Sequence, residues 1–221
     1  MELALVQLIA VYAIPVIFAI TLHEAAHALV ANRLGDPTAR LLGRVTLNPI
    51  KHIDPVGTLL VPGLMLLLSK AALGATLLFG WAKPVPVVQS NLRNPRRDMG
   101  LVAAAGPAAN LLMAFGWALM LKFIVVAGLI GQNSEFFVRM AGAGISFNLV
   151  LAFLNLMPVP PLDGGRILTS LLPPPMALQL GRLEPYGMVI LLVLLATGML
   201  GSLVLPLVAG GYNFLFDLLG L

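Results

Sequence analysis

The sequence predicts an all-α polytopic membrane protein that forms one domain over residues 1–221. Hydrophobic residues make up 59% of the chain, charged residues only 10%, and the mean hydropathy is +0.98. Long stretches of the chain contain no charged residue at all. These observations exclude an ordinary soluble domain and make a lipid bilayer the expected surroundings of the protein.

Four uncharged stretches are long enough to span a membrane: residues 3–22, 99–121, 140–162 and 186–216. A helix rises 1.5 Å per residue, so about 20 residues cross a hydrocarbon core about 30 Å thick. The first stretch follows Glu2 instead of a basic segment and runs directly into polar residues. We therefore interpret it as a retained span and not as a signal peptide, and we expect about four transmembrane helices.

Residues 55–82 are also hydrophobic, but Lys70 divides them into uncharged pieces of 15 and 12 residues. Neither piece is long enough to cross a bilayer alone. Lys and Arg residues flank the stretch on both sides, and basic loops face the cytoplasm. We therefore expect a re-entrant or short helical hairpin that begins and ends on the cytoplasmic side, with Lys70 near its tip.

The same rule places ten of the 13 Lys and Arg residues in the cytoplasm and the N-terminus outside. The net charge of +4 and the isoelectric point near 9.9 therefore indicate topology. No basic run with interleaved aromatic residues occurs, so we expect no nucleic acid partner. Residues 38–48 alternate partially between polar and apolar side chains, which predicts a small membrane-associated β element.

The motif HEAAH, at residues 23–27, follows the first predicted span. On a helix, His23 and His27 lie on one face, so both imidazoles can bind one metal ion while Glu24 approaches a water molecule. Because the chain has no Cys, a metal site must use His and carboxylate ligands, and this spacing favours zinc with Glu24 as the general base. The alternative is a chance cluster of interfacial polar residues, which is costly in a membrane.

A catalytic zinc site usually has three protein ligands. The predicted topology brings Asp163 to the same membrane face as His23 and His27, although Asp163 could instead cap the helix that begins near Gly164. His52 is a further candidate, either as a ligand or as a hydrogen-bonding residue in a basic loop. Asn110 follows the small residues of GPAAN, which favour close helix packing, and its amide could support the site.

Three motifs occur in order: HEAAH at 23–27, GPAAN at 106–110 and NLMPVPPLDGG at 155–165. Together they resemble the site-2 protease family of intramembrane zinc metalloproteases, over nearly the whole chain. The resemblance implies that His23, His27 and Asp163 bind one zinc ion, that Glu24 is the base and that Asn155 binds substrate. It also implies that the β element receives an unwound substrate as an added strand.

The chain is similar to a compact bacterial form of the family, because no PDZ or CBS domain is present. The resemblance implies a multi-pass protein of the bacterial inner membrane, with its active site towards the cytoplasm and transmembrane proteins as substrates. The oligomeric state stays open. A transporter or channel with a His and Asp site is the main alternative, followed by a structural protein. The sequence lacks the paired, interrupted hydrophobic segments of an inverted-repeat transporter, which makes the transporter interpretation less favoured.

Overall fold

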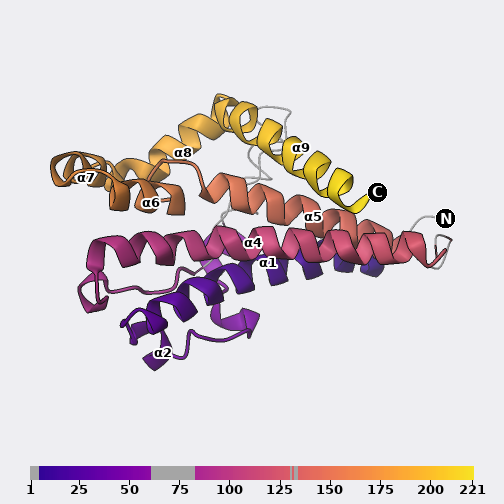
Figure 1. The fold of residues 1–221 in the computed structure, drawn as a ribbon, viewed down its shortest axis with the longest axis horizontal. Helices are drawn as coiled ribbons and strands as arrows, with labels where there is room; N and C mark the ends of the chain where they lie inside the picture. Colours follow the sequence, from indigo (N-terminus) through magenta and orange to yellow (C-terminus); the bar gives the residue numbers. More distant parts are fainter. Residues whose placement is uncertain (1–4, 61–82, 130, 132–133) are drawn as a thin grey trace.

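The computed structural model describes residues 5–60, 83–129, 131 and 134–221. Three long helices lie side by side: α1 (Leu5–Arg33), α4 (Pro95–Val126) and α5 (Glu135–Asn155) (Figure 1). The helix α9 (Met199–Leu219) packs on α5 and α4. Apolar side chains of α4, α5 and α9 form the main core, which includes Ala118, Ile145 and Val204.

Shorter helices connect the long ones. They are α2 (Thr38–Leu41), η1 (Pro49–Lys51), η2 (Pro55–Leu60), η3 (Gln89–Asn91), α6 (Asp163–Leu171), α7 (Pro174–Gly181), η4 (Glu184–Tyr186) and α8 (Gly187–Ala196). The helices α6 and α7 lie at one end of the bundle, and the start of α1 and the C-terminus lie at the other end (Figure 1). Among the described residues, five helices are long and apolar enough to cross a membrane: Val6–Arg33, Pro95–Val126, Glu135–Asn155, Pro174–Ala196 and Met199–Leu219. The protein is therefore a multi-pass membrane protein.

The predicted span 186–216 is not one helix. It is divided into α8 and α9 by Gly198, which has a φ of +75°. Gly198 donates a backbone hydrogen bond to the carbonyl of Leu195, and such a left-handed glycine typically ends a helix. Hydropathy did not reveal this break, because glycine is uncharged and common in membrane helices.

The predicted β element over 38–48 is wrong, since no strand occurs in the described part of the chain. The carboxylate of Asp36 accepts a hydrogen bond from the backbone N–H of Thr38, and the helix α2 begins there instead. Gly43, with a φ of +64°, follows the end of this short helix. Local capping therefore outweighed a partial alternation. Of the predicted hairpin over 55–82, η2 (Pro55–Leu60) is described, and residues 61–82 lie outside the described residues.

Candidate metal centre

The HEAAH motif lies within α1, which continues to Arg33 and therefore carries the motif as a regular helix. The imidazoles of His23 and His27 stack edge to face, with their ring centroids 4.6 Å apart. Their Nε2 atoms are 3.0 Å apart, and both residues are buried, with 8% exposure. One helix thus supplies two convergent nitrogen atoms.

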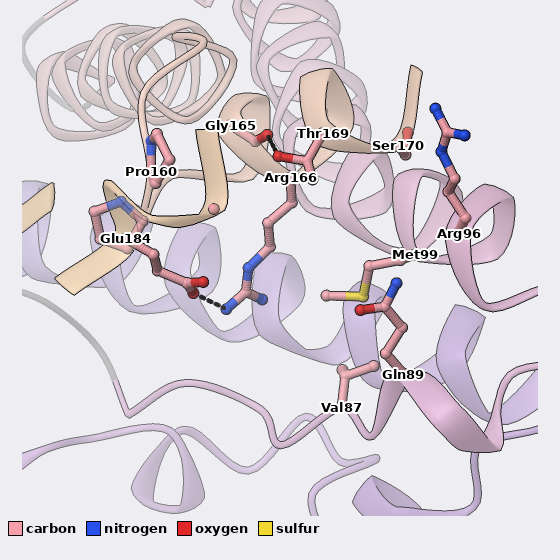
Figure 2. A pocket seen from close by; sticks show the side chains of 12 residues that line it. Val87, Gln89, Arg96, Met99, Pro160, Gly165, Arg166, Thr169, Ser170 and Glu184 are labelled. Carbon is pink, nitrogen blue, oxygen red and sulfur yellow. Dashed lines mark hydrogen bonds and ion pairs between the residues drawn. The ribbon is translucent and has the colours of Figure 1, made fainter. Parts of the chain in front are cut away.

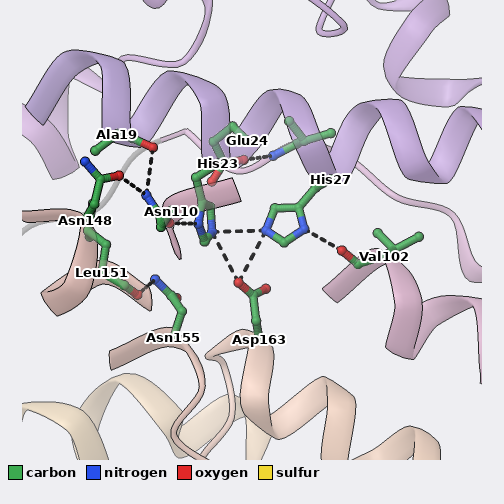
Figure 3. A network of polar contacts seen from close by, with 11 residues as sticks. Ala19, His23, Glu24, His27, Val102, Asn110, Asn148, Leu151, Asn155 and Asp163 are labelled. Atoms are coloured by element: carbon green, nitrogen blue, oxygen red, sulfur yellow. Dashed lines mark hydrogen bonds and ion pairs between the residues drawn. The ribbon is translucent and has the colours of Figure 1, made fainter. Parts of the chain in front are cut away.

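Asp163 completes this cluster from the first turn of α6 (Figure 3). Its Oδ2 lies 3.2 Å from His23 Nε2 and 3.3 Å from His27 Nε2. The turn after α5 brings α6 back towards the site, and Gly164 and Gly165 make this close return sterically feasible. A Cβ atom at Gly164 would lie 2.3 Å from the carbonyl oxygen of Leu156. The paired glycines are therefore needed to aim Asp163 at the imidazoles.

The helix α4 leaves room for the imidazoles because a glycine faces them. A Cβ atom at Gly106 would lie 2.4 Å from His27 Nε2 and 2.6 Å from His23 Cε1. The small residue of GPAAN thus allows close packing, as expected, and the packing partners are the two site histidines.

The three facing atoms fit a zinc ion. The Nδ1 atom of His27 donates to the backbone carbonyl of Val102 over 2.7 Å, and His23 Nδ1 contacts Asn110 Oδ1 over 2.6 Å. If each imidazole is neutral and protonated at Nδ1, the lone pairs of the two Nε2 atoms face Asp163 Oδ2. Among the described residues, this buried oxygen then has no hydrogen-bond donor. Three acceptor atoms this close together suit a cation bound between them. Their separations of 3.0–3.3 Å are close to the edge, about 3.3 Å, of a tetrahedron with bonds of about 2.0 Å.

Glu24 lies beside the cluster and is half-buried. Its Oε2 accepts a hydrogen bond of 2.8 Å from the backbone N–H of Val85. Glu24, the three cluster residues and Asn155 line one cavity of about 140 Å³. The carboxylate is therefore held next to the cation site, where a general base would act.

Residues 83–88 form neither helix nor strand, and Pro84, Val85 and Val87 of this segment line the cavity. Buried Arg44 donates from Nη2 to the carbonyls of Lys83, over 2.7 Å, and of Pro84, over 3.3 Å. Asp36 Oδ2 accepts a hydrogen bond of 2.7 Å from the N–H of Val88. Two buried side chains thus fix the segment that contacts Glu24.

The other predicted site residues lie in different surroundings. Asn155 lines the cavity and donates from Nδ2 to the carbonyl of Leu151 over 2.9 Å. Asn110 is fully buried behind His23, where it contacts the imidazole. His52 is outside the described metal cluster, and its buried Nε2 lies 3.0 Å from the carbonyl oxygen of Thr46. The structure therefore brings together His23, His27 and Asp163, without His52.

A second cavity, of about 210 Å³, adjoins the first (Figure 2). The two cavities share four lining residues: Val87, Met99, Pro161 and Arg166. Polar and charged side chains, including Arg96 and Gln89, line the second cavity, and Arg166 lies 3.9 Å from Glu184. A second cavity at the α6 and α7 end of the bundle thus lies next to the metal cavity.

Sequence reasoning missed Asn148, Arg44 and the segment 83–88. Asn148 could have been noticed, because a buried amide in the middle of an uncharged span needs a partner. Arg44 looked like one more cytoplasmic charge, and no local pattern indicates that 83–88 folds back over α1.

Residues 124–195 match the model of peptidase family M50. This region includes Asp163, whereas His23 and His27 lie before it. The chain is 40% identical over 208 residues to a Bacillus subtilis (strain 168) protein named "Putative zinc metalloprotease YwhC", and the match covers 93% of this chain and 89% of that protein. No solved structure matches the chain.

Two mycobacterial relatives have the name "Putative zinc metalloprotease Rip2". The protein of Mycolicibacterium smegmatis is 31% identical over 202 residues, which are 90% of this chain and 71% of that protein. The protein of Mycobacterium tuberculosis (strain H37Rv) is 32% identical over 203 residues, which are 90% of this chain and 70% of that protein. The similarity thus extends over nearly the whole chain.

Proposed function

This chain belongs to peptidase family M50 and is a zinc metalloprotease, and we propose that it hydrolyses peptide bonds in or near the transmembrane segments of other membrane proteins. One observation carries the proposal: three zinc-type donor atoms and a carboxylate line one cavity inside a bundle of apolar helices. A peptidase site enclosed by membrane helices suits a substrate that is itself in the membrane.

We assign the zinc ligands to His23, His27 and Asp163. A zinc ion held there would supply the positive charge that polarises a scissile carbonyl and acidifies water. Glu24 would accept a proton from the attacking water and later donate it to the leaving amine. The hydrogen bond from Val85 restricts the position of the Glu24 carboxylate in the cavity that the three ligands also line. Asn155, in the same cavity, is assigned to hydrogen-bond the substrate backbone.

A helical substrate must unwind before cleavage, because its peptide carbonyls are otherwise hydrogen-bonded within the helix. The segment 83–88 belongs to no helix and lines the metal cavity, which makes it a better partner for an unwound chain than residues 44–48. Pro84 and Pro86 have no N–H, and the N–H of Val85 is bonded to Glu24. We therefore expect Val87 to make most of the backbone hydrogen bonds with a substrate strand.

For the topology we propose four membrane crossings: α1, α4, α5 and a bent crossing made of α8 and α9. An even number of crossings agrees with the start of α1 and the end of α9 lying at one end of the bundle (Figure 1). The α6 and α7 end, where Asp163 lies, carries Arg166 and Arg182, so we assign this end to the cytoplasm of a bacterial inner membrane.

The comparisons do not favour the transporter alternative, since the relatives are named as metalloproteases. The test is incubation of the purified full chain with a panel of membrane-spanning peptides in detergent, with and without a zinc chelator, and analysis of the products by mass. We expect defined internal cleavage that the chelator stops and added zinc restores. Cleavage of unfolded soluble peptides alone, or products that are unaffected by the chelator, would contradict the proposal.

A further inference from the structure

A chain of buried amide contacts joins three helices behind His23 (Figure 3). His23 Nδ1 lies 2.6 Å from Asn110 Oδ1, and Asn110 Nδ2 lies 2.9 Å from Asn148 Oδ1. Asn148 Nδ2 in turn lies 2.8 Å from the backbone carbonyl of Gly144. Asn110 and Asn148 are both completely buried. We call these contacts, from Gly144 to His23, the amide network.

The direction of every hydrogen bond in the amide network follows from its last member. The carbonyl of Gly144 can only accept, so Asn148 must direct its NH2 group at it and its oxygen at Asn110. Asn110 must then direct its own NH2 group at Asn148, and this group also donates to the carbonyl of Ala19 over 3.2 Å. The oxygen of Asn110 is left facing His23. The Nδ1 atom of His23 therefore has to carry a proton, and in the neutral imidazole Nε2 then presents a lone pair.

The position of the ring proton is fixed more directly in His27 than in His23. The Nδ1 atom of His27 donates directly to the carbonyl of Val102, a fixed group that can only accept. The partner of His23 is a side-chain amide, which could present either its oxygen or its NH2 group. With the NH2 group facing His23, the proton would move to Nε2, the atom that faces Asp163. The correct state of His23 thus depends on what orients Asn110.

We propose that Asn148 is a positioning residue, which fixes the tautomer and orientation of His23 for metal binding by holding the amide of Asn110 in one direction. The inference rests on the proposed function only in taking His23 as a zinc ligand. Two completely buried amides inside apolar helices have to be hydrogen-bonded, because unpaired they would destabilise the bundle, and their partners here lead to His23. Groups that orient metal-binding imidazoles typically change metal affinity by about 10–100-fold when removed.

The test is the zinc dissociation constant of the detergent-solubilised full chain, measured by competition with a chromophoric chelator. Asn110→Leu is expected to weaken zinc binding by about 10–100-fold, and Asn148→Leu by about 3–10-fold, because Ala19 still holds part of the Asn110 amide. If Asn148→Leu does not unfold cooperatively, Asn148→Ser replaces it. A serine can bond the carbonyl four residues earlier, as Ser146 bonds Gly142, but is too short to reach Asn110.

The double variant separates positioning from packing. If Asn148 acts through Asn110, adding Asn148→Leu to Asn110→Leu changes the zinc dissociation constant by less than about twofold. Ser146→Ala, on the same helix but outside the amide network, is the matched control and should bind zinc like the wild type. Multiplying effects in the double variant, an unchanged affinity in Asn148→Leu, or an equal loss in Ser146→Ala would each overturn the proposal. The proposed protease function fails separately, if wild-type cleavage is independent of zinc.

Discussion

Replacing Gly106 by alanine adds one methyl group at the point where α4 meets the two histidines. The new Cβ atom would lie 2.4 Å from His27 Nε2 and 2.6 Å from His23 Cε1. Favourable contacts between such atoms lie at about 3.5–4.0 Å, so each imidazole would have to move by roughly 1 Å. Bonds between zinc and its ligands tolerate deviations of about 0.2 Å. The single methyl group is therefore large enough to disturb both nitrogen ligands together.

We expect Gly106→Ala to weaken zinc binding by at least about 100-fold, which corresponds to about 2.7 kcal/mol, and to abolish proteolysis. The helix itself should not be weakened, since alanine is a better helix former than glycine. The assay is zinc content and chelator competition on the purified variant, with Gly116→Ala as the control. That glycine is also in α4, and a Cβ atom there meets nothing within 4 Å. Wild-type zinc affinity in Gly106→Ala would refute the site geometry described above.

Three further predictions concern the third ligand, acid stability and topology. Asp163→Ala should lose zinc and activity together, whereas His52→Ala should keep stoichiometric zinc; the reverse result would assign the ligand to His52. Burial alone would raise the pKa of Asp36, but hydrogen bonds from Thr38, Val88 and Asn91 lower this pKa below the ordinary 3.8. The ionised carboxylate therefore stabilises the folded chain above pH 3.8, and this stabilisation should be lost as the pH falls through the lowered pKa. Thermal unfolding of Asp36→Asn from pH 7 to pH 3 should then show a smaller acid loss than the wild type, and equal losses would contradict this. Single cysteines at Arg33 and Ser90 should be labelled from the same side of the membrane, and labelling from opposite sides would overturn the topology.

The sequence was sufficient to predict the cluster that the structure brings together. The spacing of His23 and His27 needs only a regular helix, and α1 provides one. Asp163 followed from counting membrane crossings, and α6 begins at that residue beside the imidazoles. Asn110 and Asn148 could not be connected in advance, because the contact depends on the rotation of α4 and α5 about their axes. An apolar sequence with small residues on several faces does not define that rotation.

The fold was predicted in its helical class and less well in its connections. Residues 38–48 were expected to pair as strands, but Asp36 and Gly43 define a short helix and a turn through contacts that a hydropathy pattern does not record. The division at Gly198 was missed because one glycine in a long apolar stretch is compatible with a continuous helix. The position of 83–88 depends on hydrogen bonds to Arg44 and Asp36, which are distant in sequence.

The central claim is that Glu24 acts as the base beside a zinc site formed by His23, His27 and Asp163. The most direct measurement is bound zinc and cleavage of a membrane-spanning peptide in one preparation of Glu24→Gln. The amide can still accept the hydrogen bond from Val85, and all three ligands remain, so stoichiometric zinc is expected. Cleavage should fall at least about 100-fold, because an amide cannot accept the proton from water. Full zinc together with substantial residual cleavage would contradict the claim.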